Sequence, residues 1–261
     1  MAETNLYPHL SVESNKKPNR LYAFPLFGFI VKVILLIPVF VEVAVLGFVA
    51  LMALVINWFF ILFTGKYWDA AYKLFLGLFR LGAKIKLFIW GITDKYPGFT
   101  LDTSKLFELD VAKPDKPNRW LAIPFFGFLA RAFLLIPYFI FAQVMEKGSG
   151  VAMVISWFAV TFKSKFPESL YEFEKDSLRV SLATSTYMLG LSDKYPSFAI
   201  SMNHQTAKVL LLIAGALLTA GNWGNSRDLR DLNDRSVYEY NSNSNYDYAP
   251  TDEDSMSPNT Y

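Results

Sequence analysis

The sequence predicts an all-α membrane protein with minor β structure, built as a tandem repeat. Its 261 residues are 53% hydrophobic and only 18% charged, so the chain is more apolar and less charged than a typical soluble domain. The stretch PNRLYAFPLFGFIVKVILLIPVF begins at Pro18 and returns as PNRWLAIPFFGFLARAFLLIPYF at Pro117, 99 residues later. The tetrapeptide DKYP recurs with the same offset, at Asp94 and Asp193. We therefore expect two copies of one unit, each a helical hairpin plus an interfacial amphipathic helix, with short surface strands.

Composition divides the chain into four segments. The first membrane repeat occupies residues 1–105 and the second 106–202; a C-terminal apolar helix (203–223) and an acidic Tyr/Asn-rich tail (224–261) follow. The net charge is +2, yet residues 222–261 carry three arginines against eight acidic residues, so the membrane part is basic. The absence of cysteine excludes disulfides and thiolate metal sites. The polar N-terminal stretch lacks the apolar core of a secretory signal, so we expect no cleavable leader.

Short strands are predicted at the edges of each repeat. Residues 7–13 (YPHLSVE) alternate weakly between apolar and polar, and residues 106–112 (LFELDVA) are their repeat mate. A strand-like segment also follows each DKYP, namely GFTLD from Gly98 and SFAIS from Ser197. We expect the four segments to form one small sheet at the membrane surface. The alternative is that they are extended connectors.

Each repeat is predicted to open with a helical hairpin. Residues 21–64 are almost continuously apolar, whereas about 20 residues suffice to cross the hydrocarbon. The segment MEKGSG, which starts at Met145, indicates a turn that reaches water, because a charge at mid-bilayer costs about 2.5–3.5 kcal/mol. A hairpin that dips into the bilayer without crossing it remains an alternative, since the second arm is short. The predicted arms are 21–45 and 50–64, then 120–144 and 151–163.

A kink and a third helix complete each repeat. Pro38 and Pro137 lie within the first arms and are expected to bend them. Third helices are predicted from about 67 to 91 and from about 167 to 191. Glu174 adds charge to the second copy and makes it a poor spanning segment, so we expect both copies to lie at the interface, apolar side down. The charged stripe of the first copy, broken by one glycine, consists of Asp69, Lys73, Gly77, Arg80 and Lys84.

The hairpins determine the predicted topology. An even number of crossings per repeat places both PNR and both DKYP segments on one side, which the positive-inside rule assigns to the cytoplasm together with the N-terminus. Three crossings per repeat would instead invert the second repeat. We expect anionic lipids to be the partner of this basic side. The residues expected at lipid headgroups or at the interface are Lys16, Lys17, Arg20, Lys32, Lys73, Arg80, Lys84, Lys116, Arg119 and Arg131.

Two further roles are assigned to charged residues. Lys32 lies inside the first apolar arm, and Arg131 is its repeat mate. The favoured interpretation is that both snorkel to the headgroups; the alternative is that Lys32 lines a polar path with Glu42. In addition, Arg20 is expected to pair with Asp94, and Arg119 with Asp193, which would hold the start and end of each repeat together.

The C-terminal part differs from the repeats. Residues 207–220 (AKVLLLIAGALLTA) form one more apolar block, and the tail beyond it has the composition of a segment that is disordered alone. Its tyrosines would supply contact area to another membrane protein. These partner-binding residues are Tyr238, Tyr240, Tyr246, Tyr248 and Tyr261.

Several motifs resemble those of a known family. They are the PNR start, LLIP, WFFILFTGKY from Trp58 and TDKYPGFTL from Thr93; the second repeat keeps LLIP, Trp157-Phe158 and DKYP but has TFKSKFP in place of the LFTG motif. Over about residues 7–201 the chain resembles bacterial integral membrane proteins catalogued as domain of unknown function 4389. The resemblance implies a repeated protein of the bacterial cytoplasmic (inner) membrane, and it implies no activity, cofactor or catalytic residue.

The inventory of reactive groups points away from an enzyme. The chain has only two histidines, His9 and His204, in unrelated contexts, and it lacks a phosphate-binding loop, a zinc-protease motif and a nucleophile elbow. We expect no catalytic residue, metal, cofactor or nucleic-acid partner. The first hypothesis is a structural or accessory subunit that docks through its tail. The alternatives are a membrane-shaping or lipid-organising protein and, third, a small transporter or channel.

Overall fold

The computed structural model describes residues 8–12, 18–103, 107–114 and 116–221. The chain divides into two compact units, residues 1–216 and 217–261, and both repeats belong to the first. Most of the described chain is helical, with one small sheet, which confirms the predicted fold class at this level. The elements are β1 (His9–Val12), α1 (Arg20–Ala23), α2 (Phe27–Thr64), α3 (Asp69–Trp90), β2 (Phe107–Asp110), the 3-10 helix η2 (Trp120–Ala122), α4 (Phe126–Leu134), α5 (Ile136–Lys163), α6 (Glu168–Met188) and an apolar helix Gln205–Gly221.

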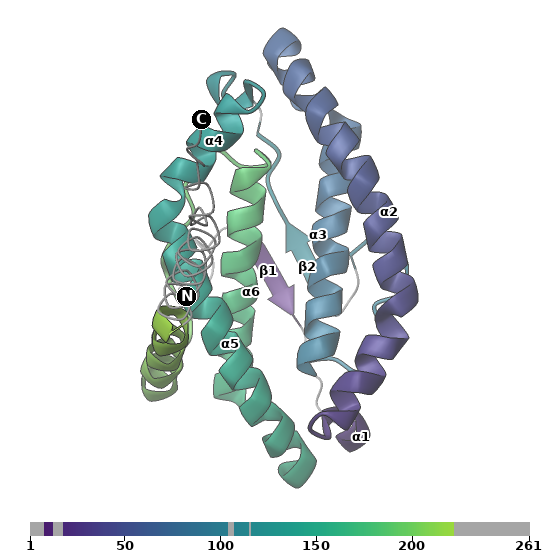
Figure 1. The fold of residues 1–261 in the computed structure, drawn as a ribbon, viewed down its shortest axis with the longest axis vertical. Helices are drawn as coiled ribbons and strands as arrows, with labels where there is room; N and C mark the ends of the chain where they lie inside the picture. Colours follow the sequence, from purple (N-terminus) through teal and green to yellow (C-terminus); the bar gives the residue numbers. More distant parts are fainter. Residues whose placement is uncertain (1–7, 13–17, 104–106, 115, 222–261) are drawn as a thin grey trace, which may run out of the picture. The chain divides into compact units, whose positions relative to one another are not determined.

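The two repeats are related by an approximate twofold axis. β1 pairs with β2 in antiparallel fashion, and Leu10 lies opposite Leu109, its own repeat mate. When equivalent residues face each other in an antiparallel pair, a twofold axis passes between them and relates the two strands. Hydrogen bonds follow the same rule: the Tyr72 hydroxyl donates to the Val111 carbonyl, and the Tyr171 hydroxyl to the Val12 carbonyl. Figure 1 shows α2 beside α3 and α5 beside α6, with the strands between the two pairs.

Two of the four predicted strands form the sheet, and the other two are extended connectors. The segments that follow the DKYP motifs pair with side chains instead of strands. Lys84 Nζ donates to the carbonyls of Thr100 (3.0 Å) and Asp102 (2.6 Å). In the second repeat Asp176 accepts a hydrogen bond of 2.9 Å from the backbone N–H of Met202. Because these backbone groups already have partners, no strand pairing is required to satisfy them.

The predicted hairpin of the first repeat is wrong. Residues 27–64 form a single helix, α2, 38 residues long, which ends at Gly65 in the left-handed conformation. Its buried residues recur along one side, against α3: Leu36 and Val39 pack with Phe88, and the same side further along is small, with Ala50 and Ala53. A continuous apolar contact with α3 therefore replaces the turn that the sequence suggested.

The predicted hairpin of the second repeat is wrong for a different reason. α5 passes without a break through the Glu146 region, where residues distant in the sequence contact its polar groups. Glu146 forms an ion pair of 2.6 Å with Lys86 of α3, and the Ser149 hydroxyl accepts a hydrogen bond of 2.7 Å from Trp90 Nε1. Gly148 lies against Phe173, so close that a Cβ would approach the ring within 2.9 Å.

The prolines act differently in the two repeats. α2 continues through Pro38. In the second repeat α4 and α5 meet at a bend of 63°, and Pro137 occupies the first turn of α5, where its missing N–H has no intrahelical partner to lose. The predicted bend is therefore confirmed near Pro137, whereas Pro38 lies inside one helix.

The third helices, α3 and α6, lie where they were predicted, but several of their charged side chains face the protein. Lys84 is buried against the connector described above, and Arg80 donates to the Leu109 carbonyl at 3.1 Å. In α6, Asp176 and Arg179 are both buried and form an ion pair with each other. These charges stabilise contacts inside the protein, so the expected interfacial position is corrected for these residues, whereas Asp69 and Lys73 remain exposed.

The arginines of the two PNR motifs lie at opposite ends of α2. Arg20, just before α2, donates to the Ser164 hydroxyl at the end of α5. At the other end of α2, the Arg119 guanidinium covers Gly65, where a Cβ would lie 2.5 Å from Nη2. Thus α2 and α4–α5 run antiparallel, and the twofold axis that relates them is roughly perpendicular to both. The two PNR segments consequently lie at opposite ends of α2.

By length and composition, α2 is long and apolar enough to cross a membrane, and the bent pair α4–α5 is a second candidate if it counts as one span. Only 22% of the most apolar window of α2 is buried inside the protein. The core helix of a soluble protein would be mostly buried.

Candidate functional site

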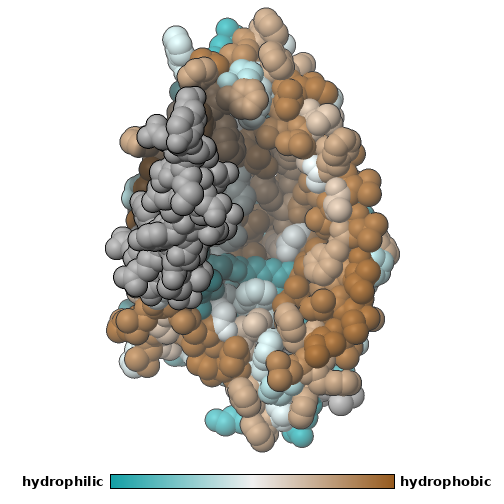
Figure 2. All heavy atoms as spheres, viewed as in Figure 1, coloured by the Kyte–Doolittle hydropathy of each residue, from teal (hydrophilic) through white to brown (hydrophobic). Residues whose placement is uncertain are grey.

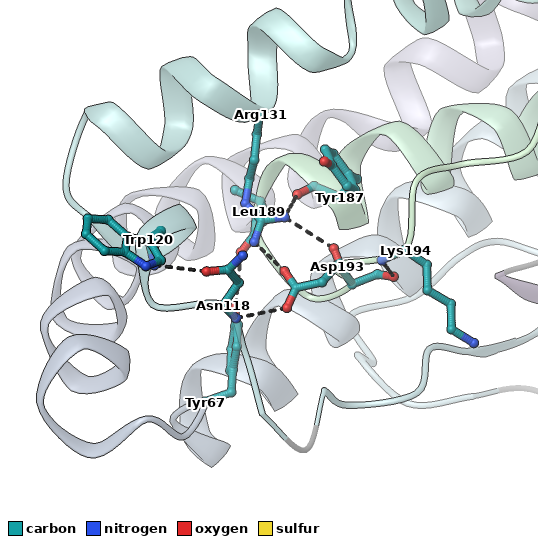
Figure 3. A network of polar contacts seen from close by, with 9 residues as sticks. Tyr67, Asn118, Trp120, Arg131, Tyr187, Leu189, Asp193 and Lys194 are labelled. Atoms are coloured by element: carbon teal, nitrogen blue, oxygen red, sulfur yellow. Dashed lines mark hydrogen bonds and ion pairs between the residues drawn. The ribbon is translucent and has the colours of Figure 1, made fainter.

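Arg131 of α4 lies at the centre of a buried polar network in the second repeat. Only 4% of Arg131 is exposed. Its guanidinium donates to the carbonyls of Tyr187 (2.8 Å) and Ser192 (3.3 Å) and forms an ion pair of 2.6 Å with Asp193 (Figure 3). It also stacks over the Tyr187 ring, 5.1 Å from the centroid. The planar fork of arginine donors suits several acceptors at once, so this buried charge is well satisfied.

The network ties the start of the second repeat to its end. The second oxygen of Asp193 accepts a hydrogen bond of 3.0 Å from the backbone N–H of Asn118, and the Asn118 side chain accepts one of 3.0 Å from the N–H of Trp120. Figure 3 shows Tyr67 of the first repeat beside this network; its hydroxyl donates to the Leu189 carbonyl at 3.2 Å. Burial raises the pKa of Tyr67, so the hydroxyl stays neutral and available as a donor.

The first repeat contains the same pocket with a different cation. Lys32 of α2 is fully buried, and its ammonium lies 5.5 Å from the centroid of the Phe88 ring, the equivalent of Tyr187. Asp94 accepts a hydrogen bond of 2.7 Å from the backbone N–H of Asn19, as Asp193 does from Asn118. Within the described part of the chain, however, Lys32 Nζ has no hydrogen-bond partner.

The structure assigns the predicted arginine pairs differently. Asp193 pairs with Arg131, and each motif aspartate binds the backbone N–H of the asparagine in its own PNR motif. Arg20 and Arg119 reach across to the other repeat, to Ser164 and Gly65. In each repeat the start and the end are therefore joined by a hydrogen bond between the backbone N–H of the PNR asparagine and the aspartate of DKYP.

The remaining predicted site residues divide into three groups. Lys32, Lys84 and Arg131 are buried, so the expected headgroup contact is corrected for them: internal acceptors, or an aromatic ring, surround each cation. Lys73, Lys116 and Arg119 are exposed and Arg80 is half-buried. Outside the described residues lie Lys16, Lys17, Tyr238, Tyr240, Tyr246, Tyr248 and Tyr261.

A basic surface pocket of about 400 Å³ adjoins the end of the second repeat. His9, Lys116 and Lys194 line it together with Lys113, whose ammonium pairs with Asp69. That pairing lowers the pKa of Asp69. Two acidic residues, Asp110 and Asp193, also line the pocket, and Asp193 is already bound to Arg131. The pocket has the charge and the size to receive a phosphate-bearing group.

A second buried polar cluster lies where α3 of the first repeat meets α5 and α6 of the second. Trp90 donates to Ser149, and Ser149 donates to the Glu174 carboxyl group at 2.5 Å. The Lys86–Glu146 ion pair lies beside this chain of hydrogen bonds and acts electrostatically on Glu174. Only 2% of Glu174 is exposed, and burial raises the pKa of its carboxyl group to about 8.

Sequence reasoning did not identify this cluster, although a signal was present. Glu174 and Ser149 of the second repeat align with Phe75 and Ala50 of the first. Polar residues that replace buried apolar ones in a single copy indicate an added feature. Among the described residues, no group of three or more histidine or acidic side chains is placed to hold a metal ion.

Comparison with protein families identifies both repeats. The family described as Domain of unknown function (DUF4389) matches residues 28–100 and 127–199, one copy in each repeat. Neither the curated proteins nor the solved structures contain a match. The two matched stretches cover more than half of the chain and confirm the resemblance carried by LLIP and DKYP. The chain therefore belongs to the DUF4389 family, of which it contains two tandem copies.

Proposed function

We propose that this chain is a non-enzymatic membrane protein that embeds α2 and α4–α5 in lipid and organises the surrounding bilayer. The observation that carries the proposal is the uncovered apolar surface of these helices. Figure 2 shows hydrophobic side chains along α2. Large apolar residues that are more than half exposed include Phe27, Ile34, Phe48, Phe63, Phe126, Phe133 and Phe162.

Such a surface is costly in water. Each square ångström of apolar surface removed from water contributes about 25 cal/mol, and exposed patches of this kind in soluble proteins mark interaction or membrane sites. The described part of the chain brings no polar layer over the outer side of α2. Lipid acyl chains are therefore the partner proposed for this surface.

The length of α2 favours an orientation along the membrane. Its 38 residues extend about 57 Å at 1.5 Å per residue, whereas the hydrocarbon core is about 30 Å thick. Crossing within that thickness would require a tilt of nearly 60°, which exceeds the usual range of up to about 40°. A helix lying along the leaflet buries its whole outer side. We therefore propose that the twofold axis runs along the membrane normal, with the N-terminus and both PNR motifs on the cytoplasmic side.

Accessibility of equivalent positions tests this orientation. Lys95 and Lys194 are repeat mates and both are exposed, and the chain has no cysteine. The variants Lys95→Cys and Lys194→Cys would be labelled with an impermeant maleimide in sealed inner-membrane vesicles of either orientation. Labelling from the same side is expected. Labelling from opposite sides would overturn the orientation and make α2 a crossing helix in an inverted repeat.

Reconstitution tests the function itself. Vesicles of phosphatidylcholine and phosphatidylglycerol are expected to change shape when the protein inserts, because a helix buried in one leaflet expands that leaflet. Vesicles that keep their shape and lipid distribution would contradict the proposal. The basic pocket is expected to strengthen the effect with anionic lipid. Lys194→Glu should weaken the dependence on phosphatidylglycerol, whereas Lys95→Glu, the equivalent lysine outside the pocket, should not.

The other two hypotheses from the sequence rest on different observations. Docking to a larger assembly depends on tyrosines outside the described residues; a pull-down from native membranes with full-length chain and with a chain cut after Gly221 tests it. A partner lost on truncation would make the protein an accessory subunit. The transport hypothesis required water access to Lys32, and the buried position of this side chain gives it no support.

A further inference from the structure

We propose that Glu174 is a proton-binding site at the contact between the two repeats, which links the stability of that contact to pH. The carboxyl group lies inside the protein, between α3, α5 and α6. One oxygen, Oε2, accepts the hydrogen bond from Ser149. The other, Oε1, is buried and has no hydrogen-bond partner among the described residues. A carboxylate leaves such an oxygen uncompensated, whereas a carboxylic acid carries no charge there.

The groups that face Glu174 do not neutralise it fully. From α3 come Lys86 and the Trp90 indole, and from α5 come Glu146 and Ser149. Lys86 is bound to Glu146 at 2.6 Å and lies over the Trp90 ring, so its charge is already shared. Glu146 is a like charge that opposes ionisation.

The remaining neighbours add no opposite charge to the site. The helix that begins at Gln205 approaches Gly148 of α5 through the backbone carbonyl of Leu211, which brings no charge. On α6 itself, Glu172 points to His204 and Asn203. Burial thus has the largest influence on the pKa of the Glu174 carboxyl group and raises it. The hydrogen bond from Ser149 and the charge of Lys86 lower this pKa by smaller amounts.

The expected pH dependence follows from proton linkage. The pKa of Glu174 is raised from 4.5 to about 8 in the folded protein. Between these two values the folded state holds a proton that the unfolded state has released, so stability falls as pH rises. Below pH 4.5 both states are protonated and the full stability is present; above pH 8 both are ionised and the loss is complete. One linked proton changes the unfolding equilibrium constant by up to about tenfold per pH unit.

The variant Glu174→Gln tests the site, with Glu172→Gln as the matched control two residues away. Unfolding of the full chain in detergent micelles would be followed from pH 5 to pH 9. The wild type and Glu172→Gln are expected to lose stability with rising pH. Glu174→Gln should be markedly flatter and more stable than the wild type at pH 8. Equal slopes in all three proteins would overturn the proposal.

Infrared spectroscopy provides a second readout that does not depend on unfolding. The wild type should show a protonated carboxyl band at pH 6 that disappears with a midpoint near pH 8. In Ser149→Ala, which introduces the residue found at the equivalent Ala50, the midpoint should move to higher pH because the carboxylate loses a donor. Absence of the band at pH 6, or an unchanged midpoint in Ser149→Ala, would contradict the assignment. Neither experiment depends on how the helices lie in the membrane.

Discussion

Lys32 and Arg131 occupy equivalent positions in two copies of one unit, yet only one of them is satisfied. Arg131 reaches two carbonyls and a carboxylate; Lys32 lies over a ring and makes no hydrogen bond within the described structure. Both pockets retain an aspartate bound to a backbone N–H. Both copies keep a buried cation at this position, and the guanidinium of Arg131 reaches acceptors that the ammonium of Lys32 does not reach.

The largest effect is expected at the satisfied pocket. Arg131→Ala should reduce the free energy of unfolding by about 3 kcal/mol, since it removes a buried guanidinium that donates to three acceptors, and each such hydrogen bond typically contributes about 1 kcal/mol. Arg131→Lys, which recreates the first-repeat pocket, should fall between the wild type and the alanine variant. Denaturant unfolding in detergent measures both, with Lys116→Ala as an exposed control. A loss no greater than that of the control would show that the two pockets do not differ in this way.

Two tyrosine hydrogen bonds cross the twofold axis, and their removal should reduce the free energy of unfolding by equal amounts. Tyr72→Phe and Tyr171→Phe each remove one donor to a carbonyl of the other repeat, which typically costs about 1 kcal/mol. The same unfolding measurement applies. Clearly different losses would mean that the repeats contribute unequally to the stability of their shared contact. The contact would then be symmetric in geometry but not in energy.

The smallest effect is expected at the unsatisfied pocket. Lys32→Met keeps the length of the side chain and removes a buried charge that has no hydrogen bond, so stability should change by less than about 1 kcal/mol in either direction. Lys32→Arg should be neutral or stabilising if the fork reaches the acceptors equivalent to those of Arg131. A loss for Lys32→Met as large as for Arg131→Ala would remove the distinction between the pockets.

The parts of this fold that depend on local pattern were predictable. The duplication, the third helices and the strands at 7–13 and 106–112 all follow from spacing and periodicity. The hairpins were not, because a charged residue such as Glu146 indicates a turn only if lipid is its sole alternative to water. The ion-pair partner of Glu146 is Lys86, which lies 60 residues away in the chain, and no local sequence pattern reveals this pairing.

The candidate site shows the same limit. Recurrence of PNR and DKYP at one offset predicts that the start and end of each repeat are joined. It did not indicate that Asp94 and Asp193 bind a backbone N–H, since every residue except proline carries one. From the sequence, Glu174 indicates only that α6 is a poor spanning segment. Its burial depends on how α6 packs against α5, which sequence spacing alone does not determine.

The pairing of Leu10 with its own repeat mate has a consequence for how such a protein assembles. Contacts that are reciprocal about a twofold axis are those of a homodimer, so the chain is equivalent to two identical partners joined covalently. Joining them raises the effective concentration of each half for the other to about the millimolar range. A sheet of two four-residue strands is too small to hold free subunits together. The covalent link therefore allows the two copies to diverge, as they have at Glu174, without the risk of coming apart.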